Sequence, residues 1–253
     1  MDENKKIGCV QKTWRGRPLN TLLSSSEVDK VYDCDPYCTF AVFNYLREGD
    51  IFVDVGAHIG CFTVFGAEAV GTSGKVVAIE PCKGNYELLC ENVRVNKFEN
   101  VETYMAGAGD GREEKATLYG YDPAGNAHQL WVDQHKPMSS FEEVRILTVD
   151  SLNLERVNVL KIDCQGYELR ALKGALSTIR KQSRMGLMIE LWPYGLREIG
   201  DSPEEMLDII VNKLGFYVHT VEDFEPRGLT LLSNKGLDMT KYGGAVNLWC
   251  LKS

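Results

Sequence analysis

The sequence is short of positive charge. Its 253 residues include 28 lysine and arginine residues against 36 aspartate and glutamate residues, which gives a net charge of −8 at pH 7. A protein that binds nucleic acid through the phosphates usually carries a basic face. The densest basic run, residues 179–184, is short, and we interpret it as cations near the end of a helix. The charge balance therefore argues against a nucleic-acid partner.

Long apolar runs are also absent. The longest uncharged stretch, residues 55–67, is too short and too rich in glycine to cross a bilayer. The charged start, "MDENKK", is followed by no apolar segment of the kind found in signal peptides. We therefore expect a cytoplasmic protein without a membrane span.

The eight cysteines are scattered and form no clear metal-binding pattern. In a reducing cytosol we expect free thiols. Cys34 and Cys38 are spaced like metal ligands, but no second pair and no nearby histidine completes a zinc site.

A regular alternation of two kinds of segment is present instead. Nearly continuous apolar runs, typical of strands covered on both faces, alternate with segments of helical periodicity. The predicted strands are 51–55, 75–80, 101–105, 158–163, 186–190, 216–220 and 245–251, and the predicted helices are 38–47, 60–70, 85–96, 169–179 and 202–215. Strands that alternate with helices predict a mostly parallel sheet with helices on both faces.

Two segments depart from this alternation. Residues 112–150 contain two strand-like runs around a polar, glycine-containing stretch, and we predict an inserted hairpin or flap there. Residues 1–37 show no clear period and are interpreted as an irregular arm or cap. The length suits one large domain, which we place at residues 38–253.

The stretch "FVDVGAHIG" indicates a ligand site. Asp54 lies near the end of the first predicted parallel strand, and Gly56 and Gly60 lead into a helix. In such sheets ligands bind at the carboxyl ends of the strands. Glycine allows a sharp turn and close approach of a ligand, and a helix N-terminus offers N–H groups to a carboxylate or phosphate.

Glu80 refines this prediction, because it ends the next strand. A carboxylate there can accept hydrogen bonds from both hydroxyls of a ribose. Dinucleotide-binding proteins also use an acid at this place, but with the pattern G-x-G-x-x-G. His58 replaces the second glycine of that pattern, so a pyrophosphate would approach less closely. The combination favours S-adenosylmethionine over NAD.

Five motifs, in order, resemble those of the FkbM-type methyltransferases: "FVDVGAHIGCFT", "IEPCKGNYELLCENVRVN", "LTVDSL", "LKIDCQGYELRALKGA" and "IELWP". The resemblance covers about residues 38–251. It implies a class I methyltransferase fold, Rossmann-like, with a seven-stranded sheet whose last strand is antiparallel. It also implies methyl transfer from S-adenosylmethionine to a hydroxyl of a sugar, glycan or natural product. The chain departs from the family pattern at His58, Lys83 and Gln165, where asparagine, proline and glutamate are usual.

The candidate reaction centre is at the ends of the fourth and fifth strands. Asp163 and Glu190 are candidates for the base that accepts the acceptor's proton and for its partner. They are also suited to a divalent cation, which we do not favour. His128, in the flap, is a further candidate base. Trp131, Trp192 and Tyr194 are candidates for stacking on the acceptor.

Asp110 is placed to reach an adenine amino group. The glycine turn, the acids and the resemblance together predict one set of cofactor-binding residues: Asp54, Gly56, Ala57, His58, Gly60, Thr63, Glu80, Pro81, Ala108, Asp110 and Asp163. Two alternative functions remain open, an NAD-dependent oxidoreductase and a non-catalytic binding module. We expect a small-molecule or glycan acceptor, whose identity the sequence does not reveal, and the oligomeric state is equally unreadable.

Overall fold

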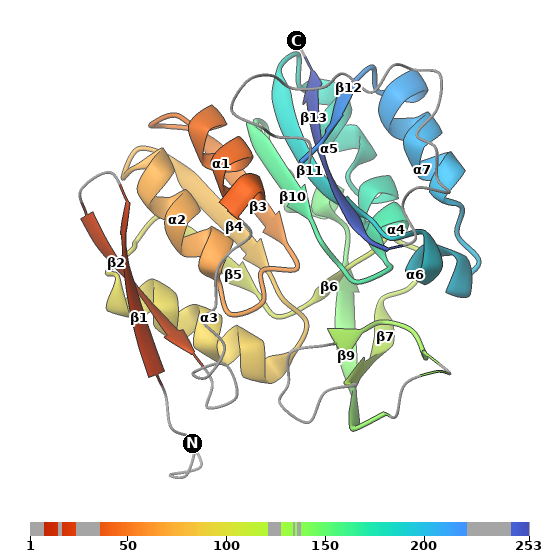
Figure 1. Ribbon diagram of the computed structural model, residues 1–253, viewed down its shortest axis with the longest axis horizontal. Coiled ribbons are helices and arrows are strands. Elements are labelled where there is room, and N and C mark those ends of the chain that lie inside the picture. The colour runs from red at the N-terminus through yellow and green to blue at the C-terminus, as the bar shows by residue number, and fades with distance from the viewer. Residues whose placement is uncertain are drawn as a thin grey trace.

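A seven-stranded sheet forms the centre of the protein (Figure 1). The structure is a computed structural model that describes residues 8–14, 17–23, 36–120, 128–133, 135, 138–221 and 244–252. The strand order is β12-β13-β11-β10-β3-β4-β5. The strands are β3 (Ile51–Val55), β4 (Lys75–Ile79), β5 (Val101–Tyr104), β10 (Val159–Ile162), β11 (Met185–Leu191), β12 (Tyr217–Thr220) and β13 (Val246–Lys252). In this sheet β13 runs antiparallel to both of its neighbours, β11 and β12, and the other neighbouring pairs are parallel. This arrangement confirms the predicted fold class.

Helices cover both faces of this sheet (Figure 1). They are α1 (Pro36–Tyr45), α2 (Cys61–Val70), α3 (Lys83–Val95), α4 (Glu168–Lys173), α5 (Leu176–Lys181), α6 (Pro193–Glu198) and α7 (Pro203–Asp208), with short helical turns η1 (Val149–Leu152) and η2 (Ile209–Lys213). Alternate strand residues supply the two cores: Phe52 packs in the cluster that contains α1 and α2, whereas Val53 packs in the cluster that contains α4 and α5. This explains the continuous apolar runs in the sequence.

The helix predicted at 169–179 is instead two short helices, α4 and α5. They meet at Gly174, where an added Cβ would lie 1.9 Å from the backbone oxygen of Gly109. The chain passes too close to another backbone there for a side chain. Asp150 then accepts the N–H groups of Ser177 and Thr178 at 3.0 and 2.7 Å and begins α5 afresh. The single-helix prediction was wrong because it depends on this tertiary contact.

The predicted flap is present as a small second sheet. Its central pair is β7 (Lys115–Gly120) and β9 (Ser140–Leu147), which are antiparallel. The short strands β8 (His128–Gln129) and β6 (Gly107–Ala108) complete the order β6-β9-β7-β8. The flap leaves the chain between β5 and β10, as the sequence predicted.

The N-terminal segment is not irregular throughout, contrary to the sequence interpretation. β1 (Gly8–Trp14) and β2 (Arg17–Leu23) form an antiparallel hairpin. Leu19 is buried in the α1–α2 core. The side chain of Asn96, at the C-terminal cap of α3, bonds both the N–H and the C=O of Asn20, at 2.9 and 2.7 Å. A lone hairpin is marginally stable, so these contacts with the helical layer explain a hairpin that the sequence pattern did not show.

Cys61, the first residue of α2, is disulfide-bonded, so the expectation that every cysteine is free was wrong here. Its partner lies outside the side chains that the structure describes. Five other cysteines are free thiols: Cys38, Cys82, Cys90, Cys164 and Cys250. Cys34, which the zinc argument concerned, lies outside the described residues. Within the described ranges, no helix combines the length and apolar character needed to cross a membrane.

Candidate active site

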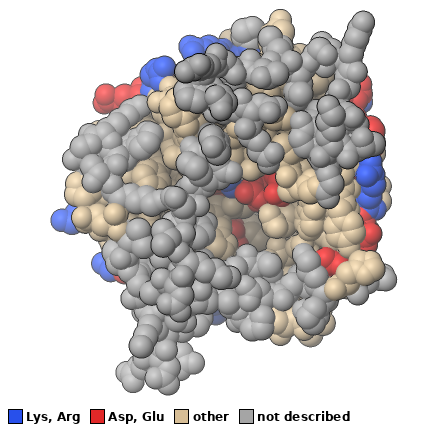
Figure 2. Space-filling view, in the orientation of Figure 1, with Lys and Arg blue, Asp and Glu red and all other residues tan. Residues whose placement is uncertain are grey.

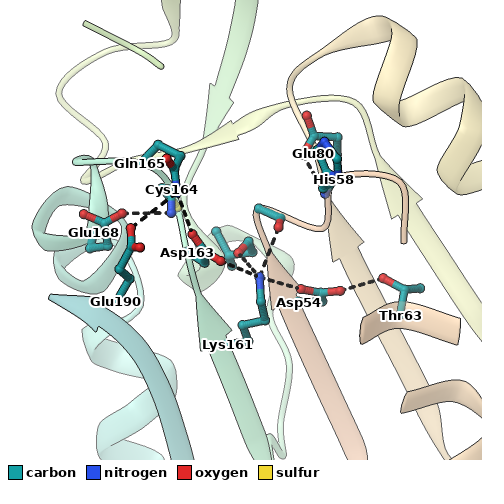
Figure 3. A network of polar contacts seen from close by, with 12 residues as sticks. Asp54, His58, Thr63, Glu80, Lys161, Asp163, Cys164, Gln165, Glu168 and Glu190 are labelled. Carbon is teal, nitrogen blue, oxygen red and sulfur yellow. Dashed lines mark hydrogen bonds and ion pairs between the residues drawn. The ribbon is translucent and has the colours of Figure 1, made fainter. Parts of the chain in front are cut away.

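The predicted site residues gather where the parallel strands β4, β3, β10 and β11 end. Figure 2 shows acidic side chains at a hollow near the middle of one face. Figure 3 shows the residues of this region, with Lys161 between two groups of acids. Such a crevice at the carboxyl ends of strands is where open α/β sheets bind ligands.

The glycine turn after β3 is shaped by packing. Gly56 has a φ of +75°, and a Cβ there would lie 1.8 Å from the backbone oxygen of Asp163. Gly60 has a φ of +88°, and its Cβ would meet the side chain of Leu89 at 2.5 Å. Neighbouring backbone therefore excludes a side chain at Gly56, and the left-handed conformation favours glycine at Gly60. The backbone contact at Gly56 is a reason that the sequence argument from ligand approach did not foresee. His58 in this turn also has a positive φ, of 54°, a costly conformation that concentrates at functional sites.

Asp54 supports this turn from below. It is fully buried, and its Oδ2 accepts a hydrogen bond of 2.7 Å from the Thr63 hydroxyl. Its Oδ1 lies 3.3 Å from Nζ of Lys161, its register partner on β10. Direct contact of Asp54 with a cofactor remains a prediction, and in this structure both carboxylate oxygens are engaged by protein groups.

Lys161 is a functional candidate that the sequence analysis missed. Its Nζ donates to the backbone oxygen of Gly56 at 3.1 Å and lies 3.7 Å from Oδ2 of Asp163. Burial lowers the pKa of this amine, but the charges of Asp54 and Asp163 raise it more, so the net pKa is raised. A signal was present: one lysine interrupts the apolar strand "VLKI", as one aspartate interrupts "IFVDV".

Glu80 lies on the other side of the glycine turn, at the end of β4. Its carboxylate accepts the N–H groups of His58 at 2.8 Å and of Cys82 at 2.9 Å. Burial raises the pKa of Glu80 to about 7 although these N–H groups lower it. The Asn85 side chain also hydrogen-bonds this carboxylate and lowers its pKa, so of about four acceptor directions three are used and one remains.

A second group of acids lies beyond Lys161. Carboxylate oxygens of Asp163, Glu168 and Glu190 lie within 4.8 Å of one another. Nε2 of Gln165 lies 3.2 Å from Asp163 Oδ1 and 3.4 Å from Glu190 Oε2, so its amide bridges the two predicted catalytic residues. Burial raises the pKa of Glu190 well above its usual range, and the charges of Asp163 and Glu168 raise it further. These surroundings therefore favour the protonated form of Glu190.

Glu168 was also missed by the sequence analysis. It is fully buried and accepts the N–H groups of Cys164 at 2.9 Å and of Gly166 at 2.9 and 3.0 Å. Burial raises its pKa to about 7. An acid in the first turn of a predicted helix is a usual capping signal, and here it fixes the loop that carries Asp163 and Gln165.

Comparison with known proteins identifies the family. The model of the FkbM methyltransferase domain matches residues 54–218. The chain belongs to this family. A curated relative, Methyltransferase 1 of Beauveria bassiana (strain ARSEF 2860), is 26% identical over 171 residues, which cover 58% of this chain and 63% of the relative. The matched part thus spans less than two thirds of that relative's length.

Among solved structures, the chain is similar to a SAM-dependent methyltransferase from Aquifex aeolicus, with 18% identity, coverage of 90% of this chain and 98% of that chain, and a TM-score of 0.46. It is also similar to the methyltransferase FkbM from Methylobacillus flagellatus KT, with 17% identity, coverage of 89% and 53%, and a TM-score of 0.48. The family assignment itself rests on the domain match, which confirms the resemblance seen in the five motifs.

Three further predicted residues of this FkbM domain are His128, Asp110 and Ala108. Nε2 of His128 lies 3.4 Å from the thiol of Cys82, which places this ring at the Glu80 end of the site. Asp110 pairs with the Arg112 guanidinium at 2.9 Å and accepts the Arg112 N–H at 3.1 Å. Ala108 is buried in β6. Their roles remain predictions.

Three aromatic rings join the flap to the acidic end of the site. Ring centroids of Trp131, Trp192 and Tyr194 are 5.9, 6.0 and 5.7 Å apart in pairs. Nε1 of Trp131 donates to the backbone oxygen of Gln165 at 2.8 Å. The flap is therefore attached to the loop that carries the bridging amide of Gln165, and the three rings pack together beside that loop.

Proposed function

We propose that this FkbM-family protein transfers a methyl group from S-adenosylmethionine to a hydroxyl of a sugar, glycan or natural-product acceptor. One observation carries the proposal. The glycine turn after β3 has acids on both sides, at the ends of neighbouring strands (Figure 3): Glu80, which is suited to bind a ribose, lies on one side, and Asp163 and Glu190 lie on the other. Membership of a methyltransferase family supports it.

The residues on the β4 side suit this methyl donor. Glu80 keeps acceptor capacity for a ribose hydroxyl beside its bonds to His58, Cys82 and Asn85. Gly60 offers no capping side chain to α2, so the N–H groups of the first turn are donors that an amino-acid carboxylate can satisfy. The bound donor would supply an already activated methyl group. The protein's remaining task is to hold the acceptor oxygen in line with it.

Asp163 is the base in this proposal. Its side chain is 35% exposed, so it can meet an acceptor hydroxyl, whereas burial and the neighbouring charges raise the pKa of Glu190 and favour its protonated form. Asp163 receives the hydroxyl proton, and Glu190 lies beside it as a hydrogen-bond donor. We assign His128 to the cofactor end rather than to proton transfer, because its ring lies against Cys82.

The proposal requires no divalent cation. The amide of Gln165 donates to both Asp163 and Glu190, so a protein group already bridges the two carboxyl groups. An acceptor that is not nucleic acid agrees with the net charge of −8. A cytoplasmic location stays part of the proposal.

A labelled donor tests the proposal. Protein and methyl-labelled S-adenosylmethionine are incubated with a cell extract, with and without a chelator, and the products are treated with mild base, which separates esters from ethers. We expect label in base-stable small molecules or glycans, and loss of transfer in Asp163→Asn. Binding of NAD but not S-adenosylmethionine in a calorimetric titration would contradict the proposal. Binding without label transfer under any condition would favour a non-catalytic module.

A further inference from the structure

Lys161 carries a buried positive charge that the proposed chemistry does not use. The residue is 3% exposed and lies within the central sheet, on the face that α2 covers. Four oxygens surround its Nζ: those of Asp54 at 3.3 Å, Asp163 at 3.7 Å, and the backbones of Gly56 at 3.1 Å and Val55 at 3.5 Å. The ring of Phe62 lies on a further side, with its centroid 5.3 Å away.

A stability role alone does not account for this arrangement. Burying an ion pair costs desolvation energy that its attraction often fails to recover, and apolar replacements of such pairs are frequently as stable. Lys161 moreover contacts more than one partner: it joins Asp54, which is wholly enclosed, to Asp163, which reaches the crevice. Its ammonium group therefore connects the turn on the cofactor side to the acid on the acceptor side.

We propose that Lys161 is a positioning residue that holds the Gly56 turn and the Asp163 carboxylate in one fixed relation and cancels part of the negative charge beneath the methyl donor. The inference rests on the proposed function, since it assumes that the donor binds over this turn. Lys161 touches neither donor nor acceptor in this account. It acts through the Gly56 carbonyl and through Asp163.

This role separates two ligands that differ in one methyl group and one charge. S-adenosylmethionine is a sulfonium cation, whereas the sulfur of S-adenosylhomocysteine is neutral. A cation below the turn weakens binding of the first relative to the second by a Coulomb term. Removal of the Lys161 charge should therefore raise the ratio of the two affinities, whereas simple loosening of the turn should weaken both equally.

The test is calorimetric titration of both ligands into wild type, Lys161→Met and Asn92→Ala. Asn92 is the matched control: it is buried and donates from Nδ2 to the backbone oxygen of Ile59 in the same turn at 2.7 Å, but carries no charge. We expect Lys161→Met to raise the preference for S-adenosylmethionine over S-adenosylhomocysteine about fivefold, as for a partly screened charge. Asn92→Ala should leave the preference unchanged.

Two further variants keep the inference falsifiable if Lys161→Met does not fold. In Asp54→Asn/Lys161→Met both buried charges are gone, yet the preference should still rise, because Asp163 is then uncompensated and nearer the crevice than Asp54. Lys161→Arg keeps the charge and should keep the wild-type preference even if both affinities fall. An unchanged preference in the folded charge-removal variants would overturn the inference. Failure of wild type to bind either ligand would instead overturn the proposed function.

Discussion

The two sides of the crevice use the same device, acids at strand ends, with different results. On the β4 side, each carboxylate has its own donors: Asp54 has Thr63 and Lys161, and Glu80 has two backbone N–H groups. On the β11 side, three carboxyl groups crowd together, and one amide bridges Asp163 and Glu190. In the first arrangement the carboxylates are held by separate protein donors, and in the second they share one donor. This difference supports the proposal that the first side binds the cofactor and the second carries out acid–base chemistry.

The largest expected effect is on protein stability and concerns Asp54, on the β4 side. Asp54→Ala leaves the Lys161 charge buried without its closest acid, which should cost about 3–5 kcal/mol of unfolding free energy. Urea denaturation of the variant measures this. Asp54→Asn/Lys161→Met is the matched comparison and should recover most of the loss. A double variant as unstable as the single one would show that the pair stabilises the fold by packing alone.

Glu168→Ala tests whether the stability of the β11 side depends on the loop that Glu168 fixes. The N–H groups of Cys164 and Gly166 would lose their acceptor in a buried place, at a cost of about 2–3 kcal/mol. Glu205→Ala is the control, because Glu205 is 43% exposed where it pairs with Lys173, and such pairs contribute about 0–1 kcal/mol. Equal denaturation midpoints for the two variants would contradict the assigned role of Glu168.

The pH dependence of cofactor binding tests the role of Glu80 on the β4 side. The pKa of Glu80 is about 7 in the free protein, and hydroxyl donors favour the ionised form, so binding should lower it. Affinity should then be constant above about pH 7 and fall up to tenfold per unit below it. Calorimetry with S-adenosylhomocysteine between pH 6 and 8 measures the slope. A flat profile would mean that Glu80 does not accept hydrogen bonds from the ligand.

The smallest effect concerns the flap. Trp131→Phe removes the hydrogen bond to the Gln165 carbonyl while keeping an aromatic ring, which should cost about 1 kcal/mol. Hydrogen exchange should show faster opening of the loop at Cys164–Gly166 and little change at His58. Uniform acceleration across both loops would instead indicate global destabilisation.

The fold and the position of the site were predictable because both depend on local pattern. The apolar runs identified the strands, and Asp54, Glu80, Asp163 and Glu190 were found because each ends or interrupts one. The missed features depend on contacts between distant segments. The role of Lys161 is explained by its contact with Asp54 on the neighbouring strand. The break at Gly174 is explained by its contact with Gly109, and the N-terminal hairpin by its hydrogen bonds with Asn96.

One requirement of the glycine turn was missed for the same reason. A Cβ on Gly56 would meet the backbone oxygen of Asp163, the residue after β10, which no pattern inside residues 51–63 reveals. The disulfide at Cys61 was likewise not predicted by the spacing of the cysteines.

The most direct test of the central claim is the affinity of Glu80→Gln for S-adenosylhomocysteine at pH 8, where Glu80 is ionised in the wild type. Loss of the charged acceptor should weaken binding about 30-fold, equivalent to about 2 kcal/mol. Glu87→Gln, an exposed acid on α3, should bind as the wild type does. If Glu80→Gln also binds with wild-type affinity, the assignment of the β4 side to the adenosyl ribose is contradicted.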